Sequence, residues 1–281
     1  MAIITAWKTP VDVTVRELEK GIAEMLMPFG GMSAFVAQGD HVVLKPDLMI
    51  TTISGSGMIT SANLVEAVVR LVQNAGAATI TIAEACENEK AFAVSGYEDV
   101  AKITGAKLVN LSSSAYVKRN ASQYLFSEEL SVYQTIVQAD VVINLPTLQT
   151  LPRFLMRCSM MNLMGCIPDF ERQRFLGESF DRALVDLYRL LQPNLTIVDA
   201  VIASELGKLV PMNMVLAGID MIALDTVAAA AIGVDAGRLQ YVVLGDQYGL
   251  GTMLPADIKI GGDDLRQMSK VLKQSRPESI N

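Results

Sequence analysis

Short runs of apolar, often β-branched residues alternate along the chain with longer stretches whose apolar positions recur at helical spacing. The apolar runs predict strands. The clearest cover residues 41–45, 78–84, 106–111, 140–145 and 195–202, and weaker strands are predicted over 2–7, 214–219 and 257–262.

Amphipathic patterns between these runs predict helices over residues 14–27, 61–77, 178–191 and 220–235. Ser61 and Asp220 stand where an N-cap is expected, and Gly76 stands where a helix would end in the left-handed conformation. The alanines of the last helix would let it approach a sheet closely.

Strands that are apolar on both faces and alternate with helices imply a mostly parallel sheet with helices on both faces, a three-layer α/β fold. The chain shows no internal repeat and no low-complexity linker. We therefore expect one α/β domain over residues 1–272, followed by a disordered tail over 273–281.

The composition predicts a large hydrophobic core, and the sequence argues against nucleic acid and membranes as partners. Of the 281 residues 51% are hydrophobic, which fits either a buried sheet or an apolar surface for self-association. The net charge of −7 and the lack of Lys/Arg clusters argue against nucleic acid as a partner. The first residues do not resemble a signal peptide, and the apolar runs are too short to span a membrane.

Three cysteines without a C-x-x-C pair favour a reduced, cytoplasmic location.

Polar side chains end several of the predicted strands, where parallel sheets bind their ligands. We expect these residues to converge on a site for a small anionic or polar ligand. From strand position alone the set is Lys45, Asp47, Glu84, Asn144 and Asp199.

Other groups with possible chemistry have simpler interpretations. His41, the only histidine, begins its strand about 13 Å from Lys45, so we interpret it as structural. The glycine-rich residues 51–61 lead into a helix and could hold an anion, although a flexible loop is favoured. Glu84, Asp199 and Asp225 could hold a hard cation such as Mg²⁺, but capping and solvated roles are favoured, and no metal site is predicted.

The chain resembles the family called domain of unknown function 362. The resemblance covers residues 42–262 through the order of the segments VVLKPDL, AGAATITIAEA, ADVVINLPTLQT, MNLMGCIPD, NLTIVDAVIA, GIDMIALDTVAAAAIGVD and YGLG. It implies no assigned reaction. Some members carry a ferredoxin-like segment, but the three cysteines of this chain cannot supply a Cys₄ cluster.

This chain departs from the family after the strand at 140–145. The family commonly has a Pro-Lys-x-Lys-Thr-His loop and later a Lys-Asn pair. The positions of these lysines and of the histidine are occupied here by Thr147, Gln149, Leu151 and Met161, whereas Pro146, Thr150, Asn162 and Gly165 are retained.

These replacements remove the groups of that loop that could transfer a proton. The resemblance adds Thr150 and Asn162 to the expected ligand-binding set, and Arg153 joins them because Arg153 or Arg157 could restore the lost positive charge. A family reaction that uses the lysines or the histidine would be lost or changed here. Whether the chain is an enzyme, and with which cofactor, is left open.

Met156, Met160 and Met164 recur at every fourth residue and form one helical stripe. We interpret the stripe as core or as a subunit interface rather than an apolar ligand pocket, and do not favour a soft-metal site with Cys158 and Cys166. The stripe supports an alternative function, a catalytically degenerate subunit that forms a homo-oligomer or binds a partner. A redox accessory role is suggested only by the iron–sulfur relatives.

Overall fold

A mixed, mostly parallel sheet forms the centre of the molecule. The computed structural model describes residues 1–270 except 49, 87, 89, 121, 122 and 178. Within these residues nine strands form one sheet in the order β11-β1-β10-β9-β7-β2-β3-β4, and β8 pairs with β9. The strands are β1 (Ala2–Lys8), β2 (His41–Pro46), β3 (Thr79–Glu84), β4 (Lys107–Asn110), β7 (Val141–Leu145), β8 (Thr147–Thr150), β9 (Leu195–Glu205), β10 (Lys208–Gly218) and β11 (Ile258–Gly262).

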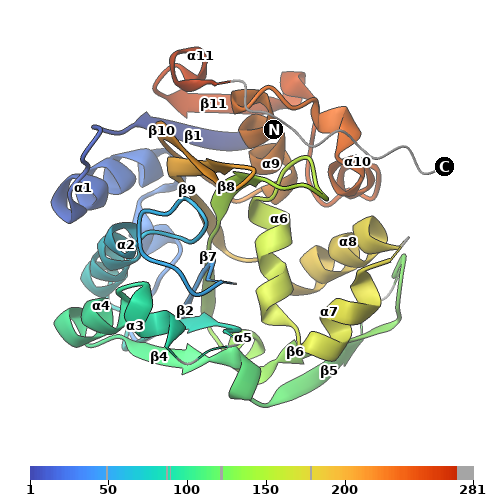
Figure 1. The fold of residues 1–281 in the computed structure, drawn as a ribbon, viewed down its shortest axis with the longest axis horizontal. Helices are drawn as coiled ribbons and strands as arrows, with labels where there is room; N and C mark the ends of the chain where they lie inside the picture. Colours follow the sequence, from blue (N-terminus) through green and yellow to red (C-terminus); the bar gives the residue numbers. More distant parts are fainter. Residues whose placement is uncertain (49, 87, 89, 121–122, 178, 271–281) are drawn as a thin grey trace.

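Helices cover both faces of this sheet, and Figure 1 shows the three layers edge-on. One face carries α1 (Val15–Leu26), α2 (Ala62–Ala75), α3 (Ala91–Val94) and α4 (Tyr97–Thr104). The other face carries α6 (Ser159–Asn162), α7 (Asp169–Phe175), α8 (Phe180–Leu191), α9 (Met221–Ala231) and α10 (Gln240–Gln247). The predicted three-layer α/β fold is confirmed.

The remaining elements lie at the ends of the layers. An antiparallel ribbon of β5 (Tyr116–Asn120) and β6 (Glu129–Tyr133) lies beside α7, and α5 (Gln134–Val137) leads from it into β7. The last helix, α11 (Leu265–Met268), follows the edge strand β11.

Each face of the sheet has its own hydrophobic core. Leu64 and Val68 of α2 pack with Leu44 and Ile82 of the sheet in one core, and all four side chains are fully buried. The second core lies under α6, α8, α9 and α10. Strands buried on both faces need apolar residues at successive positions, which explains the continuous apolar runs of β2, β3 and β7.

The predicted helix-end signals at Ser61, Gly76 and Asp220 are confirmed, and α1 has a further one. Thr14 and Glu17 form a capping box at the start of α1. Ser61 accepts a hydrogen bond from the N–H of Leu64 at 3.3 Å, and Asp220 accepts one from Ala223 at 3.0 Å. Gly76 ends α2 with φ +104°, a conformation that costs a side-chain-bearing residue free energy.

The clearest difference from the predicted strands lies at β9 and β10. Asp199 was expected to end a strand, but β9 continues six residues beyond it to Glu205 and turns into the antiparallel β10. Asp199 therefore lies in the middle of a strand. The first half of β10 was not predicted, because Pro211 and a register irregularity before Met214 interrupt its apolar periodicity. Strand β8 and the β5–β6 ribbon were also not predicted.

The methionine stripe belongs to the core of this chain. Met156 and Met160 are fully buried and Met164 is 7% exposed. Their own chain covers them, so the interpretation of this stripe as a subunit interface is wrong. The three residues do not share one α-helix either, since Met156 precedes α6 and Met164 lies in a 3₁₀ turn after it.

Two further expectations concern membranes and the end of the chain. In the described residues, no helix combines the length and the apolar character that a membrane crossing requires. The tail expected over 273–281 lies outside the described residues.

Replacing Met160 with Ala tests the core position of the stripe. We expect the free energy of unfolding to fall by about 2–5 kcal/mol, because a fully buried side chain leaves a cavity. Urea denaturation measures this loss, and light scattering reports the molar mass. A smaller molar mass with little loss of stability would instead support an interface.

Candidate functional site

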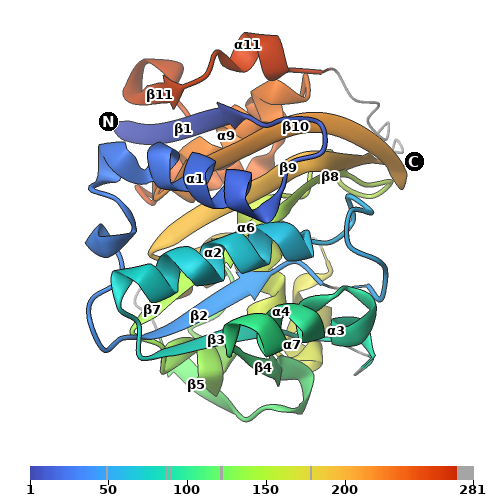
Figure 2. The same cartoon turned by 90° about the vertical axis from the view of Figure 1, so that its left-hand side faces the viewer.

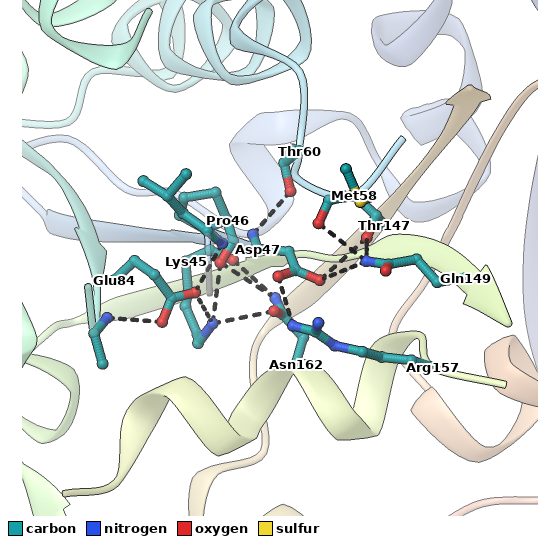
Figure 3. A network of polar contacts seen from close by, with 12 residues as sticks. Lys45, Pro46, Asp47, Met58, Thr60, Glu84, Thr147, Gln149, Arg157 and Asn162 are labelled. Atoms are coloured by element: carbon teal, nitrogen blue, oxygen red, sulfur yellow. Dashed lines mark hydrogen bonds and ion pairs between the residues drawn. The ribbon is translucent and has the colours of Figure 1, made fainter. Parts of the chain in front are cut away.

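A buried lysine lies at the centre of the carboxyl edge of the sheet (Figure 3). Lys45 is near the end of β2, and its Nζ donates to Glu84 Oε2 at 2.6 Å, to the carbonyl oxygen of Pro46 at 3.0 Å and to Asn162 Oδ1 at 3.2 Å. An ammonium group has three N–H donors, so all three are used. Lys45 and Glu84 are fully buried, which makes this a closed ion pair.

Two asparagines extend this network toward the helix layer. Asn162 of α6 donates from Nδ2 to Asn144 Oδ1 at 2.8 Å, and Asn144 of β7 donates to the carbonyl oxygen of Ser159 at 3.1 Å. Gly165 makes the close approach possible, since a Cβ there would lie 2.0 Å from Glu84 Oε1 and 2.8 Å from Lys45 Nζ. We name Lys45, Glu84, Asn144 and Asn162 the inner network.

A second cluster, the outer network, surrounds Asp47 (Figure 3). Arg157 forms an ion pair with Asp47 Oδ1 at 2.6 Å and has 11% of its side chain exposed. Thr147 and Gln149 of β8 donate to Asp47 Oδ2 at 3.1 and 3.4 Å. The N–H of Asp47 donates to Thr60 Oγ1 at 2.8 Å, so the network also reaches the glycine-rich loop.

The outer network contains two of the positions at which the family resemblance places lysines. Thr147 and Gln149 stand at those positions, and both side chains face Asp47. Here Arg157 supplies the positive charge. The sequence suggested Arg157 beside Arg153 and could not choose between them, because the choice depends on a turn after Leu151, where two backbone hydrogen bonds of 3.0 and 2.8 Å pair Gln149 with Arg157.

The structure does not bring every expected site residue to this edge. Arg153 is exposed, and its guanidinium lies 5.9 Å from the centre of the Phe154 ring. Thr150 lies at the far end of β8, where its hydroxyl accepts a hydrogen bond from Leu206 N–H at 3.2 Å. His41 lies at the start of β2 with its Nε2 3.0 Å from Thr81 Oγ1, in agreement with a structural role.

Asp199 lies at the amino end of α2, apart from both networks. Its carboxylate accepts hydrogen bonds from Ser61 N–H at 2.8 Å and Val201 N–H at 3.2 Å. Burial raises the pKa of this carboxyl group. The glycine-rich loop was considered as an anion site, but Asp199 already places a carboxylate against the first turn of α2, where an anion would bind.

A pocket of about 250 Å³ opens beside Asp199. Its walls are the glycine-rich loop from Ser54 to Ser61, the segment before α1, and Val201 and Ile202 of β9. Gly57 has φ +65°, and a Cβ there would lie 2.6 Å from the carbonyl oxygen of Ala203. The loop backbone therefore packs directly against β9 and closes one side of the pocket.

Asp225 of α9 anchors the helix that carries Asn162. Its carboxylate accepts hydrogen bonds from the N–H groups of Ser159 at 2.8 Å and Met160 at 3.2 Å, the first residues of α6. Burial raises the pKa of Asp225 to about 6. Hydrogen bonds thus connect Asp225, through Ser159 and the two asparagines, to Lys45.

The groups considered for metal binding do not assemble. Glu84, Asp199 and Asp225 bind different partners in three places. Within the described residues, no three His, Cys, Asp or Glu side chains are arranged to hold a metal ion. Burial raises the pKa of Cys166 to about 12 and that of Cys158 well above its usual value. Protonated thiols are poor metal ligands.

Replacing one partner of the Lys45–Glu84 pair tests its energetic role. We expect Lys45→Met to lower the free energy of unfolding by about 3–5 kcal/mol, because Glu84 is left buried without its cation. The double variant Lys45→Met, Glu84→Gln should recover part of this loss. Urea denaturation compares them, and Lys20→Met, in an exposed pair of 3.9 Å with Glu24, is the control with little expected change. Equal losses of unfolding free energy in Lys45→Met and Lys20→Met would contradict a special role for the buried pair.

The raised pKa of Asp225 predicts a pH-dependent stability. Its folded-state pKa of about 6 lies above the ordinary 3.8, so the folded chain keeps a proton that the unfolded chain releases. The resulting stabilisation is complete below pH 4 and disappears as the pH rises to about 6, a change of about 3 kcal/mol. The difference in unfolding free energy between the wild type and Asp225→Asn should follow this curve from pH 4 to 7. A free-energy difference that stays constant over this pH range would refute the prediction.

Two known proteins are similar to this chain over most of its length. The thylakoid-associated protein sll1697 of Synechocystis sp. (strain ATCC 27184 / PCC 6803 / Kazusa) is 28% identical over 239 residues, which cover 80% of this chain and 73% of that protein. The lactate racemase apoprotein from Thermoanaerobacterium thermosaccharolyticum aligns with a TM-score of 0.44 and 11% identity over 83% of this chain. This chain spans 58% of that structure's length.

The family model described as Domain of unknown function (DUF362) matches residues 42–230. The matched residues include every member of both networks, Asp199 and Asp225. Because the matched segment covers more than half of the chain, this protein belongs to the DUF362 family.

Proposed function

We propose that this protein binds a small polar ligand in the pocket beside Asp199. The observation that supports this most directly is a buried carboxylate that lines a pocket of about 250 Å³. The hydrogen bonds of Asp199 come from backbone N–H groups and from the Ser61 hydroxyl rather than from a cation. A carboxylate has about four lone-pair sites, so these three hydrogen bonds leave one for a ligand donor.

The charges around the pocket favour hydroxyl or amino groups on the ligand. Asp199 and the exposed Asp12 both line it, and both would repel an anion. Lys45 could have attracted an anion, but its three N–H donors are used inside the fold and it has no exposed surface. Of the anionic or polar ligands expected from the sequence, the polar class fits better.

The two networks would then act by holding the wall of the pocket. Asp47 N–H donates to Thr60 Oγ1, and Thr60 Oγ1 donates to the carbonyl oxygen of Leu145 at 2.5 Å. Thr60 directly precedes Ser61, whose N–H binds Asp199. In this proposal the outer network fixes the position of Ser61, and the inner network fixes the strands to which Thr60 is attached.

We place this activity in the reduced cytoplasm because all three cysteines are buried and free. The name of the Synechocystis relative associates that protein with the thylakoid. The alternative of a partner-binding subunit is not favoured, since the methionine stripe that suggested it is covered by the chain's own core.

A fragment titration tests the pocket. With ¹⁵N-labelled protein, we expect ethanolamine, serinol or erythritol to shift the amide signals of Ser61 and Val201, because these N–H groups bind Asp199. Asp199→Asn should weaken the binding of the amino alcohols most, because it removes the negative charge.

Asp186→Asn is the matched control. Asp186 is another fully buried aspartate that accepts backbone N–H groups, from Leu125 and Phe126, and it does not line the pocket. Its substitution should leave the fragment shifts unchanged. Shifts by inorganic phosphate alone, or no shift at these amides with any fragment, would contradict the proposal.

A further inference from the structure

A cavity at the opposite edge of the sheet from Lys45 is larger than the pocket beside Asp199. Its volume is about 900 Å³, within the range of small-molecule sites. The first residues of β1, the turn between α8 and β9, and the loop after α10 all contribute to its walls. In Figure 2 this edge is the left side, where β1 begins, whereas the loop before α2 lies on the right.

One carboxylate supplies the side-chain charge of this cavity. Among the described residues that line it, Asp220 is the only one with a charged side chain. Its oxygens accept hydrogen bonds from Ala223 N–H at 3.0 Å and Thr252 N–H at 2.9 Å, so its partners are neutral. Burial and the nearby Asp246 raise the pKa of Asp220, and a bound cation would offset both effects.

The loop after α10 packs directly against Asp220. A Cβ at Gly251 would be 2.0 Å from Asp220 Oδ1, so a larger residue would displace the loop or the carboxylate. The buried Tyr188 lies beside it, where its hydroxyl accepts the N–H of Met221 at 3.2 Å. Burial raises the pKa of Tyr188 to about 12, so the hydroxyl keeps its proton at neutral pH.

Two aromatic rings form an apolar part of the cavity wall. Phe29 and Phe35 line the cavity with their ring centres 6.1 Å apart, and both are only partly buried. Ile219, next to Asp220, is 49% exposed. Aromatic faces attract both flat apolar groups and cations.

From this combination we propose a second ligand site, which takes an amine that carries a flat apolar group. The ammonium group pairs with Asp220, and the apolar group packs on Phe29 and Phe35. This site is separate from the pocket at Asp199, so the two proposals stand independently.

Three probes of similar shape and different charge test the site: 2-phenylethylamine, 2-phenylethanol and phenylacetate. Titration calorimetry should show that the amine binds at least about tenfold more tightly than the other two. Asp220→Asn should reduce the amine to the level of the alcohol, and Asn still caps a helix, so the fold should persist. Phe35→Ala should weaken the amine and the alcohol alike.

Two controls separate this site from other effects. Asp235→Asn changes a capping aspartate that accepts Gly237 N–H at 2.9 Å and does not line the cavity, so binding should be unchanged. Asp199→Asn should also leave amine binding unchanged. Equal binding of all three probes, undiminished amine binding by Asp220→Asn, or no saturable binding at millimolar concentrations would overturn the proposal.

Discussion

The carboxyl edge of this sheet depends on the buried ion pair between Lys45 and Glu84. Two charges removed from water lose several kcal/mol of hydration free energy each, and only close, fully hydrogen-bonded contact compensates for the loss. The pair meets this demand with a contact of 2.6 Å and with Asn162, whose side chain ties β2 to β7. It also requires glycine at position 165, where any side chain would collide with Glu84. The arrangement of three strands and one helix follows from these contacts.

The strand ends could be predicted because periodicity is a local property. Lys45, Glu84 and Asn144 follow apolar runs, and parallel strands bring such residues together. Asn162 needed the family resemblance, since α6 is too short to show a pattern. Asp199 was misplaced at a strand end because a hairpin extends β9 beyond it. Arg157 was considered only beside Arg153, and the choice between them depends on a turn that no local pattern reveals.

The two edges of the sheet have different characters. At the carboxyl edge, charges are paired and buried, and the pocket there is small and acidic. At the opposite edge, a larger cavity combines aromatic rings with one carboxylate whose partners are neutral. Parallel sheets usually place their ligands at the first edge. In this protein the larger of the two spaces lies at the second edge.

The ion pair of Arg157 with Asp47 has a consequence for how this protein compares with its relatives. Residues 151–156 form a turn that returns the chain beside Gln149, so the positive charge arrives eight residues after Gln149 along the sequence. An alignment by columns would score this as a lost charge, although the carboxylate of Asp47 still has a cation. The length of the turn therefore decides whether the guanidinium of Arg157 reaches Asp47. A deletion of one residue there would separate a charge pair that no pairwise column comparison identifies.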